Sequence, residues 1–364
     1  MDLNNLPPLQ HLISSKITSL LLLDRDIERM LDKDLMMPLR YDYFERSRHN
    51  LWELITQKVA EKLPLLAPPL KINVAKYLRA MHLEIVFWLR DHDLSPQRKG
   101  LEINYRNMIC WKYDGTIDRE QTAKNYVQNG SIDARDRFIM ACNYFLTDEI
   151  LDLWDLIKVV GLQCTSRRGL NSAVRLWMNL LMEGKTEPTE EMIEEHFKAE
   201  SLKESDIPLR INAYFRFLCR ECRRDYVIKL TPFTVHKDDF RSCLLQMDET
   251  ERIALLESKP GHVVARLLEW PFQYTFIKVA AKVSSQLSLS DYKTLLAYMV
   301  KYFILKGYDF FDIFREFWSI IPNYHKNEIK KDEKRFKAYE AILNFGKENQ
   351  SKSLVVTVAE YFYS

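Results

Sequence analysis

Glycine is scarce in this sequence, with 9 residues among 364, against a usual share of about 7%. Glycine supplies the backbone freedom of tight turns and the close backbone approach of phosphate-binding loops. The shortage argues against folds built from many tight turns and against Gly-rich nucleotide sites. Strand-like alternation is also rare, whereas aromatic residues make up 12% of the chain. Because large side chains fill the space between packed helices, the composition favours an all-α fold.

An excess of charge of either sign is lacking as well. The chain has 53 basic and 51 acidic residues, for a formal net charge of +2. No overall field therefore points to nucleic acid or to an anionic membrane as a partner. The early apolar run at residues 20–23 is far shorter than the roughly 20 residues that span a bilayer, and the start MDLNNLPPLQ has no basic segment before an apolar stretch. We expect a cytoplasmic or nuclear protein without a membrane partner.

Common catalytic signatures are missing. The sequence has no G-x-S-x-G, G-x-x-x-x-G-K-[ST], H-E-x-x-H or G-x-G-x-x-G. The six cysteines are dispersed rather than arranged in a short framework, as is typical of reduced intracellular thiols. We therefore expect a protein that is not an enzyme and that uses neither a cofactor nor a small-molecule substrate.

What the sequence does contain is a recurring apolar stripe at helical spacing. Residues at i, i+3, i+4 and i+7 lie on one side of a helix. The segment 135–157 carries two such stripes, one from Phe138 to Phe145 and one from Ile150 to Ile157. In one continuous helix the second would be rotated from the first by about 120° at roughly 100° per residue. A break at 146–148 is therefore predicted, with a second helix folded back on the first. Further stripes begin at Val74, Ala173, Ile211, Phe240, Leu295 and Phe310.

These stripes predict an irregular array of antiparallel helix hairpins, similar to a helical-repeat or solenoid protein, although no fixed repeat period is found. Polar stretches with Pro or Gly suggest the divisions. We expect an N-terminal helical array at 1–183, an acidic linker with a short exposed helix at 184–207, and a C-terminal helical array at 208–364, or one continuous solenoid. Alternation at 226–236 suggests an extended segment.

Two residue patterns could hold a metal ion. Cys219 and Cys222 form a C-x-x-C pair, and His236 and Cys243 could complete four tetrahedral zinc ligands. The alternative is that the pair lies on the apolar face of a helix continuing from Phe215, because cysteine also behaves as a small buried hydrophobic residue. That placement, late in a helix, argues against a redox pair, which needs the start of a helix.

The second pattern is His92 and Asp93 with the upstream His49. A histidine with a His-Asp pair can bind a divalent metal that activates water, as in HD-type phosphohydrolases. The alternative is that His92 ends a helix before Pro96, where a histidine is favourable without any catalytic role.

Basic residues cluster at 216–224 and 326–337. Arginine binds phosphate or carboxylate through forked contacts, so the first cluster is a candidate nucleic-acid surface. The alternative for both clusters is a solvated helix face with pairs between neighbouring turns.

The stretch RFIMACNY at 137–144, followed by ILDLW at 150–154, resembles the helix-turn-helix unit of ankyrin-type repeats. The resemblance implies that Ala141 and Cys142 occupy the small-residue position of the first helix, and that Ile150, Leu153 and Trp154 lie on the second. The T-P-L-H opening and the glycine between the helices are missing, so a regular ankyrin groove is not implied. The same stretch is similar to segments of uncharacterised all-helical families expanded in arthropods, which imply no activity.

The leading expectation is a non-enzymatic scaffold of helix hairpins that binds another protein. The alternatives are a metal-dependent, HD-like phosphohydrolase and a zinc-stabilised or nucleic-acid-binding helical module.

Overall fold

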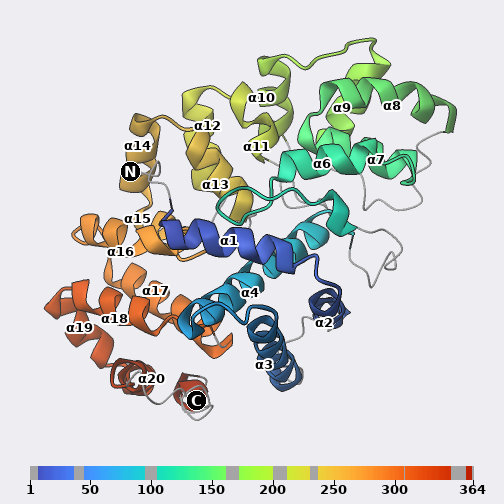
Figure 1. Ribbon diagram of the computed structural model, residues 1–364. Helices are drawn as coiled ribbons and strands as arrows, with labels where there is room; N and C mark the ends of the chain where they lie inside the picture. Colours follow the sequence, from blue (N-terminus) through green and yellow to red (C-terminus); the bar gives the residue numbers. More distant parts are fainter. Residues whose placement is uncertain are drawn as a thin grey trace. The chain divides into compact units, whose positions relative to one another are not determined.

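The computed structural model describes residues 7–36, 45–94, 105–160, 172–199, 211–229, 237–306, 308–345 and 358–362. Within these ranges the chain is helical and contains no strand, and a single β-bridge joins Trp111 to Ile117. The predicted all-α fold is therefore confirmed (Figure 1). None of the helices described is long and apolar enough to cross a membrane.

The chain divides into two compact units. The larger unit is formed by Asp2–Val227 with Val235–Gln246, and the smaller one mainly by Met247–Ser364. This division falls after α13, later in the chain than the acidic segment at 184–207. That segment contains the helix α10 (Glu190–Ala199), whose one fully buried side chain among those described is Ile193.

The larger unit contains most of the helices. In chain order they are α1 (Leu9–Leu21), α2 (Arg25–Met36), α3 (Glu45–Lys62), α4 (Pro68–Asp91), the 3-10 turn η1 (Tyr105–Met108), α6 (Arg119–Gln128), α7 (Ala134–Tyr144), α8 (Thr147–Val160), α9 (Ser172–Met182), α10 (Glu190–Ala199), α11 (Ile211–Tyr214), the 3-10 turn η3 (Phe215–Phe217), α12 (Arg220–Lys229) and α13 (Lys237–Gln246).

The predicted break within 135–157 is found. α7 ends at Tyr144, the next residue, Phe145, adopts a left-handed backbone with φ 51°, and α8 begins at Thr147. Phe138 on α7 stacks on Trp154 of α8 with ring centroids 5.9 Å apart, so the two helices pack against each other. The turn lets both apolar stripes contribute to one core, which a continuous helix could not do.

Side chains that point into the larger unit include several that are polar. Asp91 at the end of α4 pairs with Arg119 at the start of α6 at 2.8 Å, and both side chains are buried. His82 of α4 lies 3.1 Å from Asp34 of α2, also in the interior. Buried polar groups need such partners because burial removes their contacts with water. These two pairs tie α4 to α6 and to α2.

The smaller unit contains α14 (Glu249–Ser258), α15 (Pro260–Arg266), α16 (Gln273–Lys282), α17 (Leu289–Tyr302), the 3-10 turn η4 (Ile304–Lys306), α18 (Phe311–Ile320), α19 (Asn323–Lys330), α20 (Glu333–Leu343) and a last helical stretch at 358–362. Its core is aromatic. Phe317 of α18 contacts Phe276 of α16 and Tyr292 of α17 with ring centroids 5.2 and 5.8 Å apart. A reciprocal capping box of Ser288 and Asp291 begins α17.

Two of the sequence interpretations are corrected. The stripe that begins at Ile211 is not one helix, because α11 gives way to η3 and the chain is extended at Leu218 before α12 begins. The suggested extended segment at 226–236 begins instead as the last turn of α12, through Lys229. Residues 230–236 lie outside the described ranges.

Candidate functional site

Helix α1 buries its polar side and exposes its apolar side. Its buried residues are His11, Ser14, Ser15, Thr18 and Leu21. This face packs on α4, where the Thr18 hydroxyl donates to the carbonyl of Val74 at 3.5 Å and the His11 ring contacts Tyr77 edge-on at 5.0 Å. His11 Nε2 also donates to the carbonyl of Asp114 at 2.8 Å. Small side chains allow two helix backbones to approach closely, which explains why this face, rather than the apolar one, meets α4.

The opposite face of α1 is an apolar stripe open to solvent. Leu9, Ile13 and Leu20 are 71%, 51% and 61% exposed, and with Lys16 they fall within an arc of about 60° at roughly 100° per residue. Leu23, just after the helix, is 59% exposed. We call Leu9, Ile13, Lys16, Leu20 and Leu23 the α1 stripe. Single exposed leucines are ordinary, but a row on one helix face is typical of a surface that another protein covers.

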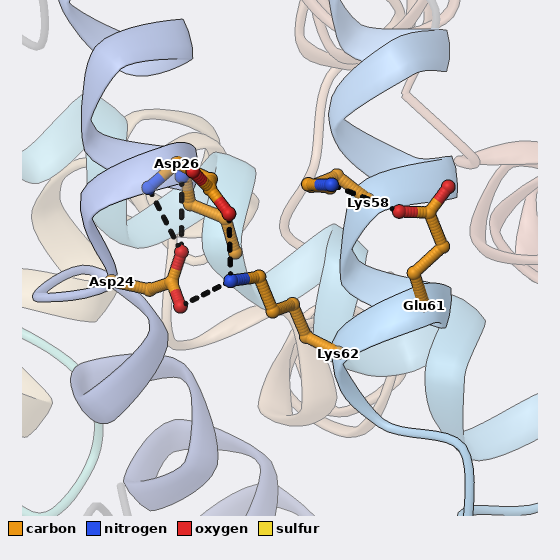
Figure 2. Close-up of polar contacts among 6 residues, drawn as sticks. Asp24, Asp26, Lys58, Glu61 and Lys62 are labelled. Carbon is orange, nitrogen blue, oxygen red and sulfur yellow. Dashed lines mark hydrogen bonds and ion pairs between the residues drawn. The ribbon is translucent and has the colours of Figure 1, made fainter.

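A set of charged residues fixes the turn at which the α1 stripe ends. The Asp24 carboxylate accepts from the backbone N–H groups of Asp26 and Ile27, at 3.0 and 3.3 Å, where α2 begins. Lys62 at the end of α3 lies 2.8 Å from both Asp24 and Asp26, as Figure 2 shows. The hydrogen bond from Lys62 is the main cause that lowers the pKa of each carboxyl. The turn after α1 is therefore held to α2 and α3 by charge.

Lys62→Met is expected to destabilise the larger unit slightly at neutral pH and not in acid. The ordinary pKa of Asp24 is 3.8 and the fold lowers it, so its contribution to stability is full above 3.8 and is lost as the pH falls through the lower folded pKa. Urea unfolding of both proteins at neutral pH and well below pH 3.8 measures the difference. Lys58→Met is the matched control, because Lys58 pairs at 3.0 Å with Glu61 on its own helix (Figure 2). An equal difference at both pH values would contradict the prediction.

The predicted HD-type residues are only partly described. His49 lies in α3 with its side chain outside the described set. The His92 ring follows α4, with Nδ1 2.6 Å from the carbonyl of Trp88 and Nε2 2.9 Å from the hydroxyl of Tyr144. Because a carbonyl only accepts, Nδ1 carries the proton, and in the neutral ring Nε2 accepts from Tyr144. Asp93 adopts a left-handed backbone with φ 55°. His92 thus links α4 to α7, and no group of potential metal ligands among the described residues includes it.

The C-x-x-C pair lies at the start of a helix, not late in one. Cys219 precedes α12 and its sulfur lies 3.5 Å from the backbone nitrogen of Cys222, which donates to it. The predicted helix from Phe215 is interrupted at Leu218, whose backbone is extended, and the Cys219 N–H donates to the Glu194 carboxylate at 3.2 Å. Burial, with Cys219 and Glu194 beside it, raises the pKa of the Cys222 thiol to about 12. The position at a helix start removes the argument against a redox pair that a position late in a helix would give.

Of the other two predicted zinc ligands, Cys243 is not brought to this pair and His236 cannot be placed. Cys243 is 1% exposed within α13 and is absent from the ligand group that contains Cys219 and Cys222. His236 lies outside the described residues. The third ligand atom beside the two sulfurs belongs to Glu194. Glu194 lies 25 residues before Cys219. No sequence motif relates a residue so far away to a C-x-x-C pair, so the sequence analysis missed it.

The arginine cluster at 216–224 is partly used within the protein. Arg223 donates to the carbonyls of Phe215 and Arg216, at 3.2 and 3.1 Å, and so closes the turn before α12. Arg224 lies 3.6 Å from Asp225. In the second cluster, Lys331 pairs with Glu328 at 2.7 Å. Such pairs are those expected of a solvated helix face.

Comparison of the chain with protein-family models, with curated proteins and with solved structures gives no match. The resemblance to ankyrin-type repeats and to helical families expanded in arthropods therefore stays a prediction.

Proposed function

We propose that this chain is a non-enzymatic scaffold that binds another protein through the α1 stripe. The observation that supports this most directly is the orientation of α1. Ser14, Ser15 and Thr18 face the interior, whereas Leu9, Ile13 and Leu20 face solvent. Because the three side chains are 51–71% exposed, each forgoes part of the about 1.5–3 kcal/mol that full burial contributes. A partner that covers them recovers this free energy.

The spacing of the α1 stripe suits one recognition mode. Leu9, Ile13, Lys16 and Leu20 follow each other at i, i+4, i+7 and i+11, which is the pattern of a helix that lies in an apolar groove. The long stem of Lys16 adds apolar surface, while its ammonium group stays in water at the edge of the contact. The partner expected from this pattern is a protein with an apolar groove and an acidic side chain beside its centre.

The turn after α1 supports the same proposal. Because Asp24 is held by Lys62 and by the backbone of α2, the end of the α1 stripe is ordered before a partner arrives. An ordered surface loses less conformational entropy on binding, which favours affinity.

Photo-cross-linking from Ile13 in the full-length protein tests the proposal. A photoreactive residue at Ile13 is expected to give a discrete product with a second protein in cells. The double substitution Leu9→Lys and Leu20→Lys is expected to reduce that product at least about tenfold, since loss of a central contact often costs about 2 kcal/mol or more. Lysine is a good helix former, so α1 itself is retained.

Leu156 provides the matched control for position and chemistry. It is a 47% exposed leucine on α8 in the same unit, outside the α1 stripe. A photoreactive residue there is expected to give no such product, and Leu156→Lys is expected to leave the Ile13 product unchanged. Products of equal yield from Ile13 and Leu156 would overturn the proposal, as would a product from Ile13 that consists only of a second copy of this chain.

A further inference from the structure

Three side chains of the kinds that bind soft divalent metals meet between α10 and the start of α12. One carboxylate oxygen of Glu194 and the sulfur atoms of Cys219 and Cys222 all lie within 4.8 Å of one another. Among the described residues this is the one group of three or more potential ligand side chains so close together. All three residues belong to the larger unit.

We propose that Glu194, Cys219 and Cys222 form a zinc-binding site. The site differs from the ligand set that the sequence suggested, because a glutamate from α10 joins the cysteine pair and Cys243 does not. It also goes beyond the proposed scaffold function, since it uses no residue of the α1 stripe.

The donor set matches the chemistry of zinc. Thiolate sulfur and carboxylate oxygen bind Zn²⁺ at about 2.3 and 2.0–2.2 Å, which places tetrahedral ligand atoms about 3.3–3.8 Å apart. The three atoms lie at most 4.8 Å apart, so binding one ion would bring the farthest pair closer by about 1 Å. Thiolates favour zinc over magnesium or calcium, which prefer all-oxygen sites. The described residues supply three of the four tetrahedral positions.

The local backbone holds the ligands in this arrangement. Glu194 accepts from the Cys219 N–H at 3.2 Å, and the Cys222 N–H donates to the Cys219 sulfur at 3.5 Å. The pair therefore sits at a helix N-terminus, where the helix dipole favours negatively charged ligands. Cys219 is exposed and the other two residues are half-buried, so an ion can reach the site from solvent.

A metal at this position would join two segments that are distant in the chain. Glu194 lies on α10, whereas both cysteines belong to the start of α12. Zinc bound only in the folded state shifts the folding equilibrium towards that state. We therefore expect Zn²⁺ to raise the midpoint temperature of thermal unfolding of the full-length protein.

Titration of the full-length, reduced protein with Zn²⁺ and Co²⁺ tests the site. One equivalent of Zn²⁺ is expected to bind in competition with a chromophoric chelator, and Co²⁺ is expected to give the near-ultraviolet absorption of thiolate-to-cobalt charge transfer. Cys219→Ser, Cys222→Ser and Glu194→Gln are each expected to weaken Zn²⁺ binding more than about tenfold, because changes even to groups behind the ligands weaken binding by about 10 to 100-fold.

Matched variants separate loss of a ligand from loss of structure. Serine at 219 is itself a favoured residue before a helix, and circular dichroism of each variant verifies that it is folded. Glu195→Gln changes the exposed neighbour of Glu194, and Cys110→Ser changes a half-buried cysteine outside the group. Both are expected to bind Zn²⁺ like the parent protein.

Three results would overturn the proposal. They are less than about half an equivalent of bound Zn²⁺, binding that Cys219→Ser and Glu194→Gln leave unchanged, and a Cys219–Cys222 disulfide that persists in protein purified with Zn²⁺. The first result would mean that the protein has no such zinc site, and the second would place the zinc elsewhere. The third would make the two cysteines a redox pair. The variants at the zinc site change no residue of the α1 stripe, so they are expected to leave cross-linking from Ile13 unaffected. Failure of the zinc site and failure of the scaffold function are therefore distinguishable.

Discussion

Trp88→Ala is expected to lower the free energy of unfolding of the larger unit by about 3–5 kcal/mol, as for other fully buried aromatic side chains cut to alanine. The Trp88 side chain is 0% exposed. Its ring lies 4.7 Å from that of His92 and 6.4 Å from that of Tyr126 on α6. Alanine at this position removes the ring contacts with His92 and Tyr126. It also leaves a cavity that the surrounding packed helices fill only in part.

Trp154→Ala is the comparison that tests the role of burial. This tryptophan is half-buried on α8, where it stacks on Phe138, and the ammonium group of Lys158 lies 5.4 Å from the centre of its ring. A smaller loss is expected because part of its surface already contacts water. Urea unfolding of each variant, followed by circular dichroism, gives the two values. A loss below about 1 kcal/mol for Trp88→Ala would mean that this side chain is not in a packed core.

Arg119→Met is expected to destabilise the larger unit by a similar amount, about 3–5 kcal/mol, because it removes a cation that pairs with a buried carboxylate. Arg119 lies 2.8 Å from Asp91, and their side chains are 4% and 2% exposed. Arg90 also lies near Asp91, at 3.8 Å, with an exposed side chain. Asp91 also ends α4, where a negative charge is unfavourable to the helix dipole, so Arg119 offsets two costs.

The double variant Asp91→Leu with Arg119→Met distinguishes a lost charge partner from lost packing. Removing both charges is expected to cost less than Arg119→Met alone, since no charge is then buried unpaired. Lys158→Met, which removes an exposed pair with Asp155, is expected to change stability little. Equal losses for the single and the double variant would contradict the assigned role, and unfolding in urea measures all four proteins.

The helices could be predicted wherever large apolar side chains repeat at helical spacing and face the interior. The stripes from Val74, Ala173 and Leu295 lie in α4, α9 and α17, and the break before Thr147 follows from two stripes that one helix cannot bury together. The irregular array of hairpins that the same stripes suggest stays a prediction. An apolar stripe shows which face of a helix is buried. It does not show which helix covers that face, because packing between helices depends on the fit of many side chains.

The start of α12 shows where helical spacing misleads. Tyr214, Phe215 and Leu218 are all buried, as a helix face would be, yet the chain leaves the helix between them. A 3-10 turn and an extended residue can bury the same side chains, so the spacing does not distinguish the two conformations. The position of the C-x-x-C pair depends on this difference. The contribution of Glu194 could not be seen at all, because it depends on how α10 approaches α12.

Helix α1 reverses the rule that apolar side chains point inward. The rule follows from the free energy of apolar burial and so assigns Leu9, Ile13 and Leu20 to a core. Here the side that meets α4 contains Ser14, Ser15 and Thr18, whose small size permits close contact. The candidate site therefore lay where the sequence pattern predicts an ordinary buried face.

The polar inner side of α1 also sets how firmly this helix is attached. Among its buried side chains Leu21 is the one large aliphatic group, and Leu22, the residue that follows, is also buried. The rest of the attachment depends on close contact with α4 and on the hydrogen bonds of His11 and Thr18. A partner bound to Leu9, Ile13 and Leu20 is expected to slow the exchange of the α1 amide hydrogens with solvent.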